Sequence, residues 1–159
     1  MTIVRTVAGL AAAALTATAL LAAPAAASAA SQKASSPWGP YDSAGHRARA
    51  AGSLTVSGED HADIPAAATA RVSGKVHDLT RGSSCGWVIF RVTYRTSGGN
   101  LPFKQHGVRN CSYGTPKSFT FTGRNVYEIE AKVCSEAKAA KPSLNCVSGG
   151  TWKVVYLSK

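Results

Sequence analysis

The cysteines are the residues of this chain whose chemistry can be read most directly from their type and spacing. There are four, at Cys85, Cys111, Cys134 and Cys146. They are spaced too widely for a structural zinc site, which needs close cysteine pairs. An even number of cysteines in an exported chain indicates disulfides. We favour Cys134–Cys146, which would close the connection between two expected neighbouring strands, and Cys85–Cys111, which would tie a central strand to the segment after it, although other pairings are open.

The histidines do not indicate an active site. A nucleophilic triad needs a serine or cysteine beside a histidine that a carboxylate orients. His61 lies in the acidic run 59–63 and His77 precedes Asp78, but the cysteines are expected to be oxidised and no nucleophile is clearly paired with either histidine. The acidic run lacks the Asp-x-Asp-x-Asp-Gly order of a calcium loop and is interpreted as a turn. We expect no enzymatic activity, no catalytic residues, no metal site and no cofactor.

A basic region at 104–109 is joined in sequence by Lys117 and Arg124, and Phe103 and Tyr113 are interleaved with these residues. Positive charge with interleaved aromatic rings is typical of surfaces that bind nucleic acids or other polyanions. A solvated rim without a ligand is the alternative interpretation. The candidate polyanion-binding residues are Arg91, Arg95, Lys104, His106, Arg109, Lys117 and Arg124.

Trp38 and Tyr41 stand close together in a segment, 31–51, that is otherwise rich in serine, proline, glycine and alanine. Such a composition has no helical or strand period and predicts an irregular segment. The two rings could form an aromatic contact surface for a sugar or a peptide. Alternatively, they dock onto the domain and cover one of its edges.

The first 30 residues have the pattern of a secretory signal peptide. Arg5 supplies the positive charge, an uncharged apolar stretch follows up to Ala23, Pro24 breaks it, and Ala27-Ser28-Ala29 is a cleavage site. The formal net charge of +10 becomes +9 once Arg5 is removed. We therefore expect an extracellular protein, either free or associated with the cell wall, whose charge favours anionic partners.

From residue 52 onward, apolar residues alternate with polar ones, and glycine, proline, asparagine and serine separate the runs. The run Trp87-Val88-Ile89-Phe90 is apolar on both faces, which predicts a central strand. A turn is expected at 123–125. The expected strands cover residues 53–58, 69–77, 86–95, 107–112, 117–122, 126–134 and 151–157.

These strands predict one all-β domain over 52–159: an antiparallel, immunoglobulin-like sandwich of about seven strands with two disulfides. A small closed β-barrel is the alternative. The expected core consists of Leu54, Val56, Val72, Val76, Val88, Phe90, Val92, Phe119, Phe121, Tyr127, Ile129, Val133, Trp152, Val154 and Tyr156.

Several short motifs are spread over the chain: Trp38-Gly39-Pro40-Tyr41, Cys85-Gly86-Trp87, Tyr127-Glu128-Ile129-Glu130 with Val133-Cys134, and Gly150-Thr151-Trp152. With the alanine-rich signal peptide, they resemble small secreted actinobacterial proteins of uncharacterised function. The resemblance covers nearly the whole mature chain and implies export and two disulfides. It implies no activity, so no functional residues are carried over.

The sequence thus predicts a secreted, non-enzymatic binding or envelope-associated module. Its expected partner is an anionic polymer, for example an anionic cell-wall polymer or polysaccharide. A secreted protease inhibitor is the alternative, with an extracellular protease as partner. In that case Lys141 and Pro142, inside the loop that Cys134–Cys146 would close, would be presented to the protease.

Overall fold

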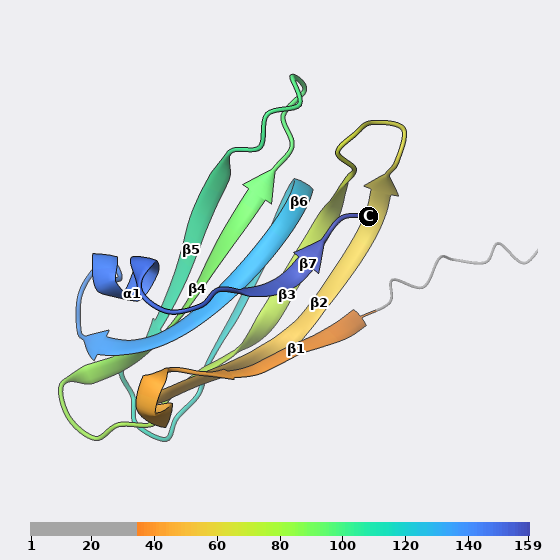
Figure 1. The fold of residues 1–159 in the computed structure, drawn as a ribbon. Coiled ribbons are helices and arrows are strands. Elements are labelled where there is room, and N and C mark those ends of the chain that lie inside the picture. The colour runs from red at the N-terminus through yellow and green to blue at the C-terminus, as the bar shows by residue number, and fades with distance from the viewer. Residues whose placement is uncertain (1–34) are drawn as a thin grey trace, which may run out of the picture. The chain divides into compact units, whose positions relative to one another are not determined.

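The computed structural model describes residues 35–159, which form an antiparallel sheet of seven strands in the order β1-β2-β3-β6-β4-β5, with β7 paired to β6 (Figure 1). The predicted signal peptide, 1–30, lies outside the described residues. Among the described residues, no helix has the length and hydropathy to cross a membrane. The strands are β1 (Ser35–Asp42), β2 (Ala48–Asp60), β3 (Ala67–Asp78), β4 (Ser84–Tyr94), β5 (Phe103–Asn110), β6 (Lys117–Ala137) and β7 (Lys153–Leu157). The helices are the short η1 (Ala44–His46) and α1 (Leu144–Ser148).

Strand β6 connects the two layers of the fold. Its residues 117–126 pair with β3, whereas residues 126–137 pair with β4, and β7 pairs with residues 128–131 on the side opposite β4. The sheet therefore folds over at β6 into a sandwich-like arrangement, which confirms the predicted all-β class. It does not close into a barrel, because β1 and β5 each pair with one neighbour within residues 35–159.

The turn expected at 123–125 is wrong, because β6 continues through these residues. The register against β3 shifts here, opposite Ala68 and Ala70, and Asn125 has a φ of 55°. A bulge of this kind bends a strand and increases its twist without ending it. The glycine and asparagine that suggested a turn instead allow one strand to serve both layers.

The irregular segment expected at 31–51 is also wrong over most of its described length, since β1 and the start of β2 lie there. The indole of Trp38 is 4% exposed and packs edge-on against Phe90, with ring centres 5.4 Å apart. A Cβ atom on Gly52 or Gly74 would lie 2.8 or 2.7 Å from Cζ2 of Trp38. The two glycines therefore leave the space that the indole fills, and this non-local fit outweighs the local composition.

Most of the expected core is confirmed. Leu54, Val72, Val76, Val88, Phe90, Val92, Ile129 and Val133 are buried in one cluster, and Val56, Phe119, Phe121 and Tyr156 pack against it. The prediction that Val154 belongs to the core is wrong, since its side chain is 56% exposed. Trp152 and Tyr127 are half-buried and lie outside the cluster. The register of β7 shifts opposite Ile129 and Glu130, so Val155 packs against the core in place of Val154, next to the correctly predicted Tyr156.

Both predicted disulfides are confirmed. Cys85–Cys111 ties the start of β4 to the segment after β5, and Cys134–Cys146 ties β6 to α1. The second disulfide holds the segment between β6 and β7, residues 138–152, which we call the strap.

Phe90→Ala should lower the free energy of unfolding by about 3–5 kcal/mol, because it removes a fully buried ring that contacts three other aromatic rings. Phe103→Ala is the matched control, since Phe103 is 57% exposed. Chemical denaturation measures both changes. Equal losses in the two variants would contradict the described register.

Gly74→Ala should destabilise the protein by about 1–3 kcal/mol, because overpacking forces neighbouring groups to shift. The added Cβ would lie 2.6 Å from the carbonyl oxygen of Ala51. Gly98→Ala is the control, since the nearest atom to a Cβ there is 3.8 Å away. Thermal unfolding compares the two, and an unchanged melting temperature for Gly74→Ala would show that Trp38 does not fill this space.

Candidate functional site

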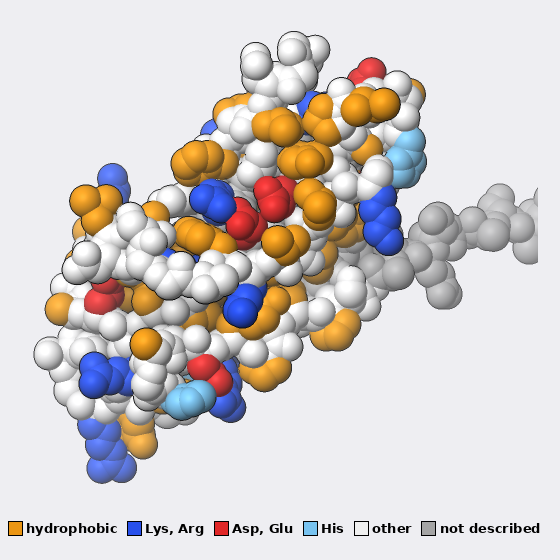
Figure 2. All heavy atoms as spheres, in the orientation of Figure 1, with side chains coloured by type: hydrophobic (Ala, Val, Ile, Leu, Met, Phe, Trp, Pro, Cys, Tyr) orange, Lys and Arg blue, Asp and Glu red, His pale blue; other side chains and the backbone are white. Residues whose placement is uncertain are grey.

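Arg91 lies on the outward face of β4 and is held by its neighbours. Its Nε donates to Glu130 at 2.6 Å, and its guanidinium lies 4.9 Å from the ring centre of Trp152. Figure 2 shows acidic and basic side chains gathered on the visible face, with hydrophobic side chains around them. The charge of Arg91 is therefore neutralised by Glu130.

Arg95 is also neutralised within the protein. Its guanidinium lies 3.6 Å from a carboxylate oxygen of Asp60 and 3.3 Å from one of Asp63, and it donates to the carbonyl oxygen of Pro65 at 3.1 Å. The side chain of Arg95 is only 14% exposed. The two aspartates of the acidic run thus hold an arginine, which fixes the β2–β3 loop.

The other predicted basic residues do not form one surface. Arg109 lies over the ring of Trp87 and donates to the carbonyl oxygen of Ala139. Lys117 and Arg124 are exposed, but they stand at the two ends of the first half of β6. At about 3.3 Å per residue they are about 23 Å apart.

His106 and Lys104 lie on β5. The ring of His106 stacks on Phe121 with centres 4.7 Å apart. Burial, together with the nearby charge of Lys104, lowers the pKa of His106. His106 is therefore disfavoured as a cation, and Lys104 is exposed beside it.

Of the two candidate aromatic contacts, Trp38 is part of the core and cannot meet a ligand at the surface. Tyr41 is half-buried and lines a cleft. Of the two interpretations of the aromatic pair, docking onto the domain is therefore the one that applies to Trp38.

Ser84 stands in Gly82-Ser83-Ser84-Cys85-Gly86, which has the spacing of the Gly-x-Ser-x-Gly motif of hydrolases. In those enzymes the serine lies on a sharp turn between a strand and a helix. Here Ser84 begins β4 and pairs with Ala137 of β6. Within residues 35–159, no hydrogen bond joins Ser84 to a histidine, so this spacing does not produce the catalytic geometry.

A cleft of about 730 Å³ lies beside the second half of β6. One wall is formed by residues 40–47, at the end of β1 and around η1. The opposite wall is formed by residues 145–153, from α1 to the start of β7, and residues 132–135 of β6 form the floor. In Figure 1 the end of β1, the end of β6 and the start of β7 converge on this region.

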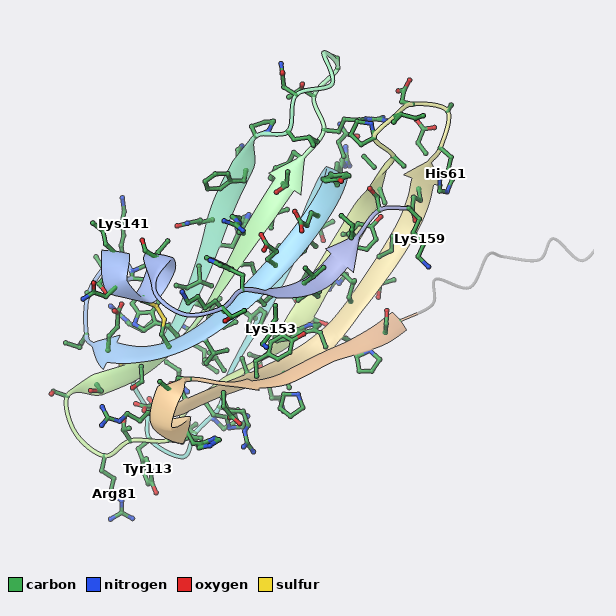
Figure 3. The ribbon with its side chains drawn as sticks, in the orientation of Figure 1. His61, Arg81, Tyr113, Lys141, Lys153 and Lys159 are labelled. Atoms are coloured by element: carbon green, nitrogen blue, oxygen red, sulfur yellow. A yellow bond between two sulfur atoms is a disulfide. The ribbon has the colours of Figure 1, made fainter. Side chains whose placement is uncertain are left out.

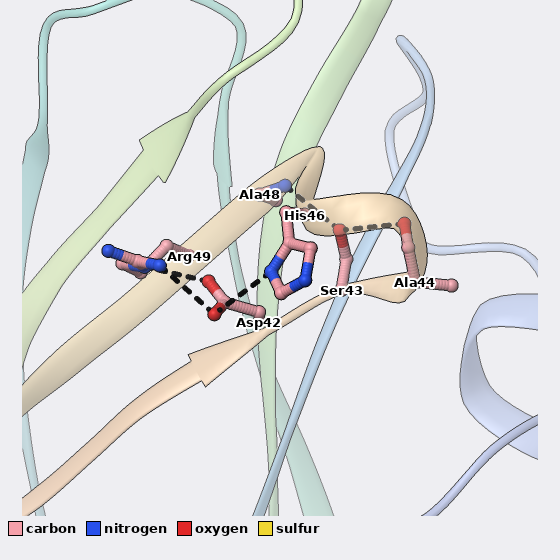
Figure 4. A network of polar contacts seen from close by, with 6 residues as sticks. All are labelled: Asp42, Ser43, Ala44, His46, Ala48 and Arg49. Atoms are coloured by element: carbon pink, nitrogen blue, oxygen red, sulfur yellow. Dashed lines mark hydrogen bonds and ion pairs between the residues drawn. The ribbon is translucent and has the colours of Figure 1, made fainter.

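The wall around η1 is a tight turn held by polar contacts (Figure 4). Asp42 accepts from Nε and Nη2 of Arg49 at 2.7 and 3.1 Å, and the ring of His46 lies 3.3 Å from it. The hydrogen bond from Arg49 is the largest cause of the lowered pKa of Asp42. The buried hydroxyl of Ser43 accepts from the backbone N–H of Ala48 at 2.9 Å. The acidic group of this wall is thus already paired.

The opposite wall consists mostly of the strap, which is held against β6. Glu136 accepts from the backbone N–H of Ser143 at 2.8 Å, and the hydroxyl of Ser143 caps α1 by accepting from the N–H of Cys146 at 3.2 Å. The disulfide from Cys146 to Cys134 fixes α1 against β6. The cleft is therefore bounded by a covalently anchored wall.

Lys132 is the central residue of the cleft. The residue is 7% exposed, and its ammonium donates to the carbonyl oxygen of Val147 at 3.3 Å. Within residues 35–159 it makes no ion pair with a carboxylate. Burial lowers the pKa of Lys132. On the other face of β6, the hydroxyl of Ser135 is buried and makes no hydrogen bond among the described residues.

Two further cations line the cleft. Arg47 lies on the η1 wall and Lys153 on the β7 wall, and both are exposed. Figure 3 places Lys153 on the side of β7 that faces β1. Three basic residues thus surround a cleft whose one acidic residue, Asp42, is paired with Arg49. This arrangement can hold an anionic group, because hydrogen bonds between oppositely charged groups are strong and a buried cation is stabilised by an anion beside it.

Lys132 was not among the predicted site residues. The alternation that places Ile129 and Val133 in the core puts Lys132 on the outward face of β6, but the strap covers that face. A partial signal was present, since the predicted disulfide Cys134–Cys146 brings the strap back to β6 only two residues from Lys132.

No protein-family model matches the chain, and no curated protein or solved structure matches it either. The cleft is therefore interpreted from its own geometry and charge.

Proposed function

We propose that the protein is a secreted, non-enzymatic binding module that holds an anionic polymer in the cleft around Lys132. The observation that carries this proposal is Lys132, a buried residue that lines the cleft and makes no ion pair with a carboxylate among the described residues. Burying a charge without a partner costs several kcal/mol. An anionic ligand would supply the missing partner.

Arg47 and Lys153 support the same function at the mouth of the cleft. Because they are exposed, their attraction to an anion is screened over about 8–10 Å near physiological ionic strength. They would speed association and make it sensitive to salt, whereas Lys132 would hold the ligand after it has entered. Binding should therefore weaken as salt is added.

The two disulfides indicate an oxidising environment. Together with the predicted signal peptide and the basic charge, they support a function outside the cell, for example at the cell wall, where an anionic polymer would be the partner.

The protease-inhibitor alternative has less support. Lys141 is exposed on the strap (Figure 3). However, the strap lies against the sheet: a Cβ on Gly107 would lie 3.5 Å from Trp87 and 3.9 Å from Pro142. A loop that enters a protease must stand clear of its own domain.

Lys132→Met should lower the affinity for an anionic polymer at least about tenfold, because a hydrogen bond to a charged group contributes about 1.5–3 kcal/mol. The melting temperature should stay the same or rise, since the substitution removes a buried charge that has no anionic partner among the described residues. Titration calorimetry with polyglutamate, heparin and polyphosphate, at low and moderate salt, measures the first effect, and thermal unfolding the second.

Lys104→Met is the matched control, because it removes the same charge from an exposed position outside the cleft. Its affinity should change by less than about threefold, as exposed ion pairs contribute about 0–1 kcal/mol. Equal losses of affinity in the two variants would show that binding depends on the overall positive charge of the surface and not on the cleft. Absence of binding to every probe at low salt would reject the function.

A further inference from the structure

The floor of the cleft is the edge of a strand. Strand β3 leaves this side of β6 at Val126, and β7 pairs with it only as far as Ala131, opposite Lys153. From residue 132 to residue 137, β6 pairs with β4 on its other side alone, within the part of the chain that the structure describes. We call this side of residues 132–137 the free edge of β6.

The free edge arises where the strap turns away from β6. Gly150 has a left-handed φ of 69°, and Trp152 lies over Arg91 and Lys132 on the outward face of the sheet. The residues before Lys153 therefore cross the outward face of β6 instead of extending β7 along its edge. The cleft lies beside residues 132–135, between this crossing and the η1 wall.

A strand edge presents N–H and C=O groups that can pair with another extended chain. Proteins that bind peptides by strand addition use such an edge for affinity and nearby pockets for side-chain specificity. At about 3.3 Å per residue, the floor formed by residues 132–135 matches about four residues of an extended chain. The volume of the cleft, about 730 Å³, lies within the range of about 300–1,000 Å³ typical of ligand sites.

We propose that the ligand is an extended, acidic polypeptide segment that adds as a strand to the free edge of β6 and places a carboxylate on Lys132. The proposal rests on the function proposed above and names the class of polymer. A second acidic side chain two residues along the ligand would lie on the same face as the first, and the other cations of the cleft, Arg47 and Lys153, would add to the attraction. A polysaccharide could satisfy the cations but could not pair with the strand edge.

The test uses three synthetic peptides of alternating threonine and glutamate: the parent, one N-methylated at every threonine, and one N-methylated at every glutamate. The N–H groups of alternate residues in a strand point to opposite edges, so each methylated peptide loses one edge and keeps the other. The three have the same charge.

Strand addition predicts that one methylated peptide binds the intact protein like the parent, whereas the other binds at least about tenfold more weakly, because it loses its backbone hydrogen bonds to β6. Hydrogen exchange should show the amides of residues 132–135 protected by the parent peptide and not by the weak one. Lys132→Met should weaken the parent peptide without changing the ratio between the two methylated forms.

Equal binding of all three peptides would overturn strand addition and leave the anion-binding function intact. Binding of heparin or polyphosphate through Lys132, with no binding of the parent peptide, would show that the ligand is a different class of polymer. Failure of every probe, peptides included, to bind through Lys132 would reject the proposed function itself.

Discussion

The architecture depends on one strand that belongs to both layers. Strand β6 runs unbroken from Lys117 to Ala137, and the bulge near Asn125 redirects it from β3 to β4. Strands that change layers at a bulge are a recognised way to make the corners of folded sheets. Since β3 and β7 both leave β6 before its last residues, the same redirection produces the core and exposes the floor of the cleft.

The strap is the second determinant of the site. It crosses the outward face of the sheet, where Glu136, Cys134 and Lys132 anchor it through a hydrogen bond, a disulfide and a contact with Val147. A face that would otherwise be solvated becomes partly buried. Lys132 is therefore deprived of water by residues that lie far from it in sequence, which is why its environment differs so much from that of Lys104.

The parts of the fold that depend on local pattern could be predicted from the sequence. Alternation placed most strands, and the apolar run around Phe90 correctly indicated a central strand. The disulfides followed because neighbouring strands bring Cys134 and Cys146 together. By contrast, the bulge near Asn125, the fit of Trp38 onto two glycines and the shifted register of β7 depend on contacts between distant segments, which composition and periodicity do not contain.

The same limit applies to the site. The basic residues were visible in the sequence, but charge is useful only where it is not already neutralised. Arg91 and Arg95 are paired with carboxylates, and Arg109 contacts the strap. Tertiary neighbours decide which cations remain available to a ligand. The candidate site therefore consists of Lys132, Arg47 and Lys153 and not of the predicted cluster.

The recess around the free edge has a consequence for aggregation. An exposed strand edge is a general hazard, because strands of other molecules can pair with its free N–H and C=O groups and start aggregation. Here the edge lies on the floor of the cleft, between the η1 turn and the strap. An edge that is flanked on both sides in this way is less accessible to the edge of another sheet than one that stands clear of its own domain.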